Sequence, residues 1–209
     1  MPLQNRVTPE GEIIAHSAYG LFMGNRGGQL HDNKKKLTNR RWASKAWIAC
    51  SLDFEARDHG IMAPGHYTEL FFLDEATALA AGHRPCALCR RADFVRFMDL
   101  WRDINGLSER PKVEDVDDVL HGQRVTRSHD KVVEQTALGD LPAGAMFRGP
   151  GGPMLVTADV PLLWTPEGYH ADTGAGPDRD DLVEVLTPVA IVRLLAAGYV
   201  PVLHGSAGG

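Results

Sequence analysis

The residues best suited to chemistry are three cysteines, Cys50, Cys86 and Cys89. The last two form a Cys-x-x-Cys pair directly after Pro85, and two thiols on such a tight turn can point at one position in space. This geometry is typical of half of a tetrahedral zinc site, because zinc prefers thiolate and imidazole ligands. An odd number of cysteines argues against a disulfide framework, and it favours a reduced compartment with a metal or redox role.

Local signals predict the elements that position these thiols. Residues 70–73 form a short apolar run of the strand type. Asp74 suits the N-cap of a helix over residues 75–81, and Gly82 suits its end. Upstream, residues 45–54 alternate apolar and polar side chains, which predicts a strand with Cys50 and Phe54 on its inward face. Cys50 is therefore the expected third thiol ligand.

The segment from Phe71 to Arg91 resembles the second half of the amino-terminal zinc module of the Ada DNA methyl-damage repair proteins. Both have two aromatics that end a strand, a short alanine-rich helix, Gly-x-Arg-Pro and then Cys-x-x-Cys with basic residues. The chain departs from that pattern at His83, at Ala92 and at Phe54, where the module would carry another thiol four residues after Cys50. The resemblance implies a zinc module that contacts DNA, and in Ada a zinc-bound thiolate accepts a methyl group from a DNA phosphotriester. The whole chain also resembles a family of uncharacterised bacterial proteins that share residues 23–27 and 67–76, and no activity carries over from them.

Two histidines compete for the fourth position on the metal. His31 ends a glycine-rich segment, residues 20–32, which reads as a loop, and a hairpin from it into the Cys50 strand would bring the imidazole near the thiols. His59 lies about where the second thiol of an Ada-like module would fall. We favour His31, because it lies beside glycines that allow unusual backbone conformations. If no metal binds, the three cysteines would serve as small buried apolar residues. A thioredoxin-like redox pair is a further alternative, but such a pair begins a helix, and here it follows the end of one.

Charge is distributed unevenly along the chain. Residues 1–48 carry eight Lys and Arg against three acidic residues, although the formal net charge of the whole chain is −5. Basic residues interleaved with Trp42 and Trp47 can bind a nucleic-acid strand by charge and stacking, and the alternatives are a solvated loop and two core tryptophans. The residues expected to contact nucleic acid are Arg26, Lys34, Lys35, Lys36, Arg40, Arg41, Arg90 and Arg91.

The remaining pattern predicts an α+β fold. Apolar residues recur at helical spacing over residues 91–104, which would close an Ada-like metal-binding unit at 1–104. Residues 105–140 read as a connector with a short helix over 113–120. Residues 141–209 read as a small antiparallel β unit with one C-terminal helix after Pro188, a loop over 168–181 and a last strand over 199–204.

These features favour a zinc-stabilised, nucleic-acid-binding protein related to DNA damage sensing or repair. One alternative is a metal-dependent hydrolase of phosphodiesters, using His31-Asp32 or His129-Asp130, and another is a structural protein-interaction module. The sequence does not decide whether the chain is an enzyme, and it gives no oligomeric state or protein partner. No apolar run is long enough to cross a bilayer and no signal-peptide core is present at the start, so a cytoplasmic location is expected.

Overall fold

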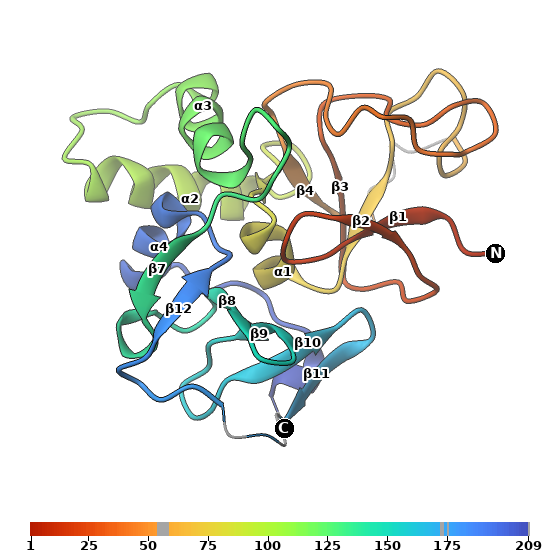
Figure 1. Cartoon of the computed structure of the whole chain (residues 1–209). Coiled ribbons are helices and arrows are strands. Elements are labelled where there is room, and N and C mark those ends of the chain that lie inside the picture. The colour runs from red at the N-terminus through yellow and green to blue at the C-terminus, as the bar shows by residue number, and fades with distance from the viewer. Residues whose placement is uncertain (54–58, 172–173, 175, 209) are drawn as a thin grey trace.

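A computed structural model describes residues 1–53, 59–171, 174 and 176–208. The fold is mixed α+β, with two six-stranded sheets and four α-helices in the described part of the chain. The first sheet is built from residues 4–85 and the second from residues 134–185, and three of the helices pack together at one side of both (Figure 1). Phe54, expected on the inward face of the Cys50 strand, lies outside the described residues.

The first sheet has the strand order β2-β1-β5-β3-β4-β6. Pairs β1–β5 and β4–β6 are parallel and the other neighbours are antiparallel. Its strands are β1 (Gln4–Val7), β2 (Ile13–Ala15), β3 (Phe22–Asn25), β4 (Ile48–Ser51), β5 (Leu70–Phe72) and β6 (Arg84–Pro85).

The expectation of a loop over residues 20–32 was wrong for its first part, because β3 runs through it in the interior of the sheet. Gly24 explains why a glycine stands in a buried strand. A Cβ there would lie 2.0 Å from the carbonyl oxygen of Ile48 and 3.0 Å from the ring of Phe72. The close approach of β3 to its neighbours therefore requires glycine, and it sets the register that places Met23 opposite Cys50.

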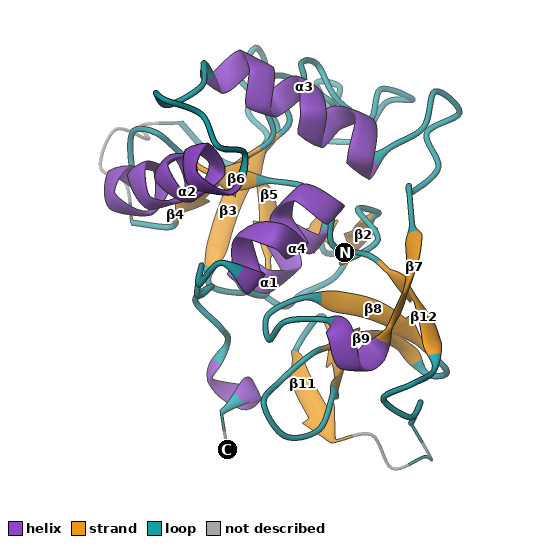
Figure 2. Cartoon of the chain, turned by 90° about the vertical axis from the view of Figure 1, so that its left-hand side faces the viewer, coloured by secondary structure: helices purple, strands orange, loops and turns teal. Residues whose placement is uncertain are grey.

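Helix α1 (Glu75–Ala80) lies near the middle of the molecule, between the two sheets (Figures 1 and 2). Its predicted N-cap is confirmed, since the Asp74 carboxylate accepts the Thr77 backbone N–H at 2.9 Å, and Gly82 follows its end with a φ of 85°. All six residues are buried. Ala78 packs against the first sheet, Ala76 against the second sheet and Leu79 against the other helices. A helix of six residues is not stable by itself, so α1 is stabilised by the packing around it.

Three further helices share one core with the second sheet. They are α2 (Arg91–Ile104), α3 (Val113–Arg124) and α4 (Val189–Ala196). The predicted helix over 91–104 is confirmed, and α3 is one turn longer than the expected 113–120. Phe97, Leu120, Phe147 and Leu194 are fully buried in this core. The division of the chain at residues 104 and 140 stays a prediction, and side chains from all three parts contribute to the core. No helix among the described residues is both long and apolar enough to cross a membrane.

The second sheet is antiparallel throughout, with the order β11-β10-β9-β8-β12-β7. Its strands are β7 (Glu134–Ala137), β8 (Met146–Gly149), β9 (Gly152–Leu155), β10 (Leu162–Thr165), β11 (Gly168–Ala171) and β12 (Leu182–Val185). The expected antiparallel sheet is therefore present, but β11 lies in a stretch that was predicted to be a loop.

The predicted last strand over residues 199–204 was also wrong. This segment runs without regular structure past the N-terminus of α1. The Glu75 backbone N–H donates to the carbonyl of Val202, and the Val202 N–H donates to the Glu75 carboxylate, both at 3.0 Å. The His204 N–H donates to the Asp74 carboxylate at 3.1 Å. The segment thus satisfies its backbone groups on a helix end instead of a sheet edge.

Candidate metal centre

The three cysteines converge. Their sulfur atoms all lie within 4.8 Å of one another, and the three thiols are not joined as disulfides. Cys50 comes from the interior of β4, Cys86 directly follows β6, and Cys89 lies in the turn before α2. The arrangement brings together one thiol from a strand and two from a turn, as the sequence predicted.

Backbone pairing explains this convergence. Strand β6 lies parallel to β4 with Pro85 opposite Ala49, and the Cys86 N–H donates to the Ala49 carbonyl at 2.9 Å. The Arg90 N–H then donates to the Cys86 carbonyl at 3.2 Å, which closes the turn and returns Cys89 toward β4. The Cys-x-x-Cys turn is therefore fixed to the Cys50 strand on one side and to α2 on the other.

Hydrogen-bond donors point at two of the sulfurs, and the three thiols differ in pKa. The Ser51 backbone N–H donates to the Cys89 sulfur at 3.4 Å, and the Leu88 N–H donates to the Cys86 sulfur at 3.5 Å. A hydrogen bond from the Cys50 thiol lowers the pKa of Cys86, and the same bond raises the pKa of Cys50. Burial raises the pKa of Cys89. Three thiolates this close repel one another, and a divalent cation between them would offset that repulsion.

The donor set and its dimensions fit zinc. Tetrahedral coordination with zinc–sulfur bonds of about 2.3 Å separates the sulfurs by about 3.8 Å, which the observed cluster accommodates. Met23 and Phe71 form an apolar wall around Cys50 and Cys86. Within the described residues no histidine, aspartate or glutamate joins the three thiols as a fourth ligand.

The structure gives His31 a different position from the one expected. Its ring is buried, with Nδ1 2.6 Å from the Thr68 hydroxyl and Nε2 3.2 Å from the Ala63 carbonyl. Both nitrogens are thus engaged in tying the glycine-rich segment to the loop before β5. His31 misses the thiols because the chain leaves β3 at Asn25 and folds into a separate excursion, marked by a bridge between His31 and Leu37.

The other candidate histidine, His59, contacts the segment that leads into β5. Its Nδ1 is 3.3 Å from a carboxylate oxygen of Glu69, and its ring stacks on His66 with centroids 3.9 Å apart. Tyr67 contacts the His59 ring and also packs against the apolar residues around the thiols. His59 is therefore near this region but is not grouped with the sulfurs.

Two of the basic residues expected to bind nucleic acid are buried. Arg90 is 6% exposed and pairs with Glu75 and Asp93, both at 2.7 Å, so it joins α1 to α2. Arg26 is 2% exposed. The remaining six are at the surface: Lys34, Lys35, Lys36, Arg40, Arg41 and Arg91. Sequence alone does not reveal the burial of the two arginines, because Glu75 and Trp47, their buried partners, are distant in the chain.

The two histidine–aspartate pairs considered for hydrolysis are not arranged for it. His31 is engaged as described, and Asp32 accepts the backbone N–H groups of Lys34 and Lys36, which caps a turn. The His129 ring packs edge-on against Trp42 at 4.8 Å. Asp130 accepts the Ser128 hydroxyl. Neither pair lies with the three thiols.

Comparison with known proteins gives no relative: no family model, curated protein or solved structure matches the chain. The assignment of a function therefore depends on the geometry of the chain itself.

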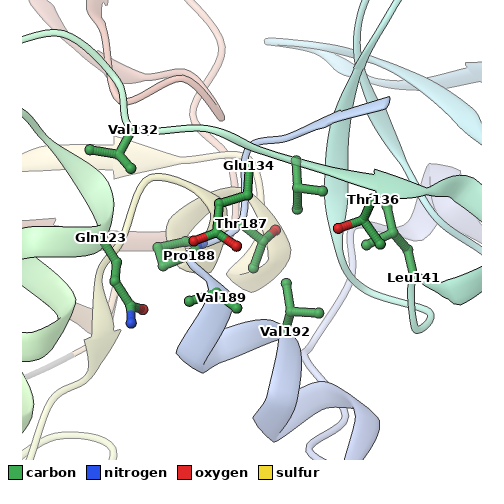
Figure 3. A pocket seen from close by; sticks show the side chains of 10 residues that line it. Gln123, Val132, Glu134, Thr136, Leu141, Thr187, Pro188, Val189 and Val192 are labelled. Carbon is green, nitrogen blue, oxygen red and sulfur yellow. The ribbon is translucent and has the colours of Figure 1, made fainter. Parts of the chain in front are cut away.

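One hollow adjoins the centre, and another lies apart from it. An open depression of about 440 Å³ adjoins Cys89, the most exposed of the three thiols, and is lined also by Phe22, Arg91 and Asp93. A second pocket lies between α3, α4 and β7, and its walls are mainly valine, leucine and proline side chains (Figure 3). Its one amide, Gln123, accepts the Ala190 backbone N–H at 2.9 Å. The second pocket therefore offers apolar surface without a cluster of reactive groups.

Proposed function

We propose that this protein binds one zinc ion through Cys50, Cys86 and Cys89, and that the ion fixes the end of the first sheet to the start of α2. The observation that carries the proposal is the convergence of three free thiols from a strand and a turn within 4.8 Å. Soft sulfur donors select zinc over magnesium or calcium, and two of the sulfurs already accept backbone N–H groups. The resemblance of residues 71–91 to the Ada zinc module supports the same ion.

A structural role follows from where the ligands lie. An ion held by these thiols would join β4, the end of β6 and the turn before α2, which are segments distant in sequence. The free energy of zinc binding would then contribute directly to folding of the first sheet. The half-buried Cys89 would remain the one ligand with access to solvent.

Metal analysis of the purified chain tests this proposal. We expect about one zinc per chain, and we expect Cys86→Ser to lose it. His31→Ala should keep its zinc, because both nitrogens of His31 already have other partners. Substitution with cobalt(II) would show sulfur-to-metal absorption that decreases in each cysteine variant. A reduced, freshly purified protein that contains no metal and takes up none would refute the proposal.

Nucleic-acid binding is a second candidate, and the exposed segment from Lys34 to Arg41 favours it. All five of its basic side chains are at the surface, and the half-buried Trp42 follows directly. We propose single-stranded or damaged DNA as the ligand, because the Ada resemblance points to damage sensing or repair. Binding should weaken steeply with salt, and replacement of Lys34, Lys35 and Lys36 by glutamate should abolish it. Unchanged mobility of a labelled oligonucleotide at low salt would exclude this function and leave the zinc proposal standing.

A further inference from the structure

Three cationic side chains converge on another cavity, which lies beside Ala81 at the C-terminal end of α1. Arg26 follows β3, Arg124 ends α3, and Lys131 lies in the segment leading to β7. They line the same small cavity of about 30 Å³, together with Arg41, Trp42 and Trp47. Arg26 and Arg124 are each only 2% exposed. Long cationic side chains are rarely this buried unless an opposite charge accompanies them.

The hydrogen-bond partners of these cations are neutral. Arg26 donates to the Gly11 carbonyl at 2.8 Å and to the ring of His83 at 3.4 Å. Burial keeps the pKa of His83 well below its usual value, so this ring is a neutral acceptor.

The other two cations follow the same pattern. Arg124 donates to the carbonyls of Gly82 and Lys45 at 2.7 and 2.6 Å, and Lys131 donates to the Ala80 carbonyl. Among the described residues, the buried Arg124 Nε has no hydrogen-bond partner. Across the part of the chain that the structure describes, no carboxylate pairs with any of the three.

Aromatic contacts fix the two guanidinium groups. The Arg26 and Arg124 guanidinium carbons lie 3.8 and 4.0 Å from the centroid of the Trp47 ring. The attraction of a cation to an indole ring is smaller than the penalty for burying a charge that has no ion-pair partner in contact. Accordingly, burial lowers the pKa of both arginines to about 9 and that of Lys131 to about 7. The surroundings thus hold positive charge at a cost that a bound anion would offset.

We propose that this cavity binds the phosphate group of a small phosphorylated molecule, with Arg26, Arg124 and Lys131 as its ligands and Arg41 at its mouth. Phosphate matches the donor set, because guanidinium and ammonium groups make strong charge-assisted hydrogen bonds to its oxygens. The cavity's volume of about 30 Å³ admits a few water-sized atoms, which suits a tetrahedral oxyanion better than a nucleobase. The proposal does not depend on the zinc centre.

Acidic residues at the same cavity limit the kind of ligand. Glu10 and Glu12 line it with the four cations, which leaves a formal excess of two positive charges. That excess equals the charge of one dianionic phosphate. A polymer with a phosphate at every unit would bring further negative charge against these two carboxylates. The composition of the cavity therefore favours a phosphomonoester over a nucleic-acid backbone.

The experiment uses the full zinc-loaded chain and inorganic phosphate as the probe. Thermal stability is followed as phosphate is added, with chloride at matched ionic strength as the reference. We expect saturable stabilisation by phosphate alone, and an affinity about tenfold weaker or more in Lys131→Gln, since hydrogen bonds to charged groups contribute about 1.5–3 kcal/mol. Arg41→Gln should also weaken binding, whereas its exposed neighbour, Arg40→Gln, does not line the cavity and should not.

Two competitors identify the source of the phosphate. Glycerol 3-phosphate should displace inorganic phosphate, and a single-stranded oligonucleotide without terminal phosphates should not. Displacement by the oligonucleotide would overturn the small-ligand proposal in favour of a polymer. No stabilisation beyond that of chloride, or an equal loss in Arg40→Gln, would show that the three cations serve only the end of α1 and would overturn the site itself.

Discussion

The zinc centre predicts a measurable dependence of stability on free zinc. A ligand that binds only the folded state adds RT ln(1 + [L]/Kd) to the free energy of unfolding, which is about 2.7 kcal/mol at 100 Kd and about 1.4 kcal/mol for each further tenfold increase. The unfolded chain is a poor competitor, because Cys50 and the Cys86–Cys89 pair meet only through the pairing of β4 with β6. We therefore expect the unfolding free energy of the wild type to rise by about 1.4 kcal/mol per decade of buffered zinc above the Kd.

Cys86→Ser removes one of three thiol ligands and should abolish this slope. With chelator present it should differ from the wild type by only about 1 kcal/mol, because a buried sulfur is replaced by an oxygen of similar size. Urea unfolding at several buffered zinc concentrations measures both quantities.

His31→Ala is the matched control. It should lower stability at every zinc concentration, because it removes a buried side chain bonded to Thr68 and Ala63, and it should leave the slope unchanged. A wild-type stability that does not change with zinc, or a Cys86→Ser variant with the full slope, would refute the reasoning.

Three further predictions concern the rest of the chain. Gly24→Ala should destabilise by more than about 2 kcal/mol, since its Cβ would meet backbone at 2.0 Å, whereas Gly122→Ala, in open space on α3, should stabilise by about 0.5–1 kcal/mol in the same urea assay. Glu75→Ala should cost about 3–5 kcal/mol, because it removes a partner from the buried Arg90; a loss below 1 kcal/mol would contradict this. Without phosphate, the free energy of unfolding should rise between about pH 7 and 10. In this range Lys131 binds a proton in the unfolded chain but loses it in the folded protein, where burial lowers its pKa to about 7. Lys131→Gln should flatten that rise.

Local chemistry made the centre of the fold predictable. The N-cap at Asp74, the stop at Gly82 and the Cys-x-x-Cys turn depend on residues within a few positions of one another, and all three are found where expected. Helix α2 was predictable for the same reason, since its apolar spacing repeats within the helix. The third thiol was within reach of sequence reasoning because period-2 alternation orients Cys50 inward.

Features set by distant contacts could not be predicted. The segment around β3 resembles a loop because several glycines in and beside the strand signal turns. Only the neighbouring strands show that Gly24 is there for close packing. The position of His31 depends on its contacts with Thr68 and Ala63, and no residue near His31 in the sequence predicts these contacts. Burial of Arg26 was hidden for a similar reason, since arginine is normally a surface residue and its aromatic partner Trp47 lies on another segment.

The electrostatics of α1 connect the two proposed sites. At its N-terminus two carboxylates complement the positive end of the helix dipole: Asp74 accepts the Tyr169 hydroxyl, and Glu75 accepts the Tyr199 hydroxyl and binds Arg90, the residue directly after Cys89. The end of the metal-binding turn is thereby fixed to the start of the helix.

At the other end of α1, the carbonyls of Ala80 and Gly82 accept Lys131 and Arg124. A helix C-terminus carries only about half a negative charge, and in a helix of six residues the alignment of dipoles is short. It can orient these cations but cannot neutralise three of them. The positive charge that remains around Trp47 is the physical reason to expect an anion there, and it would be present whether or not the thiols hold zinc.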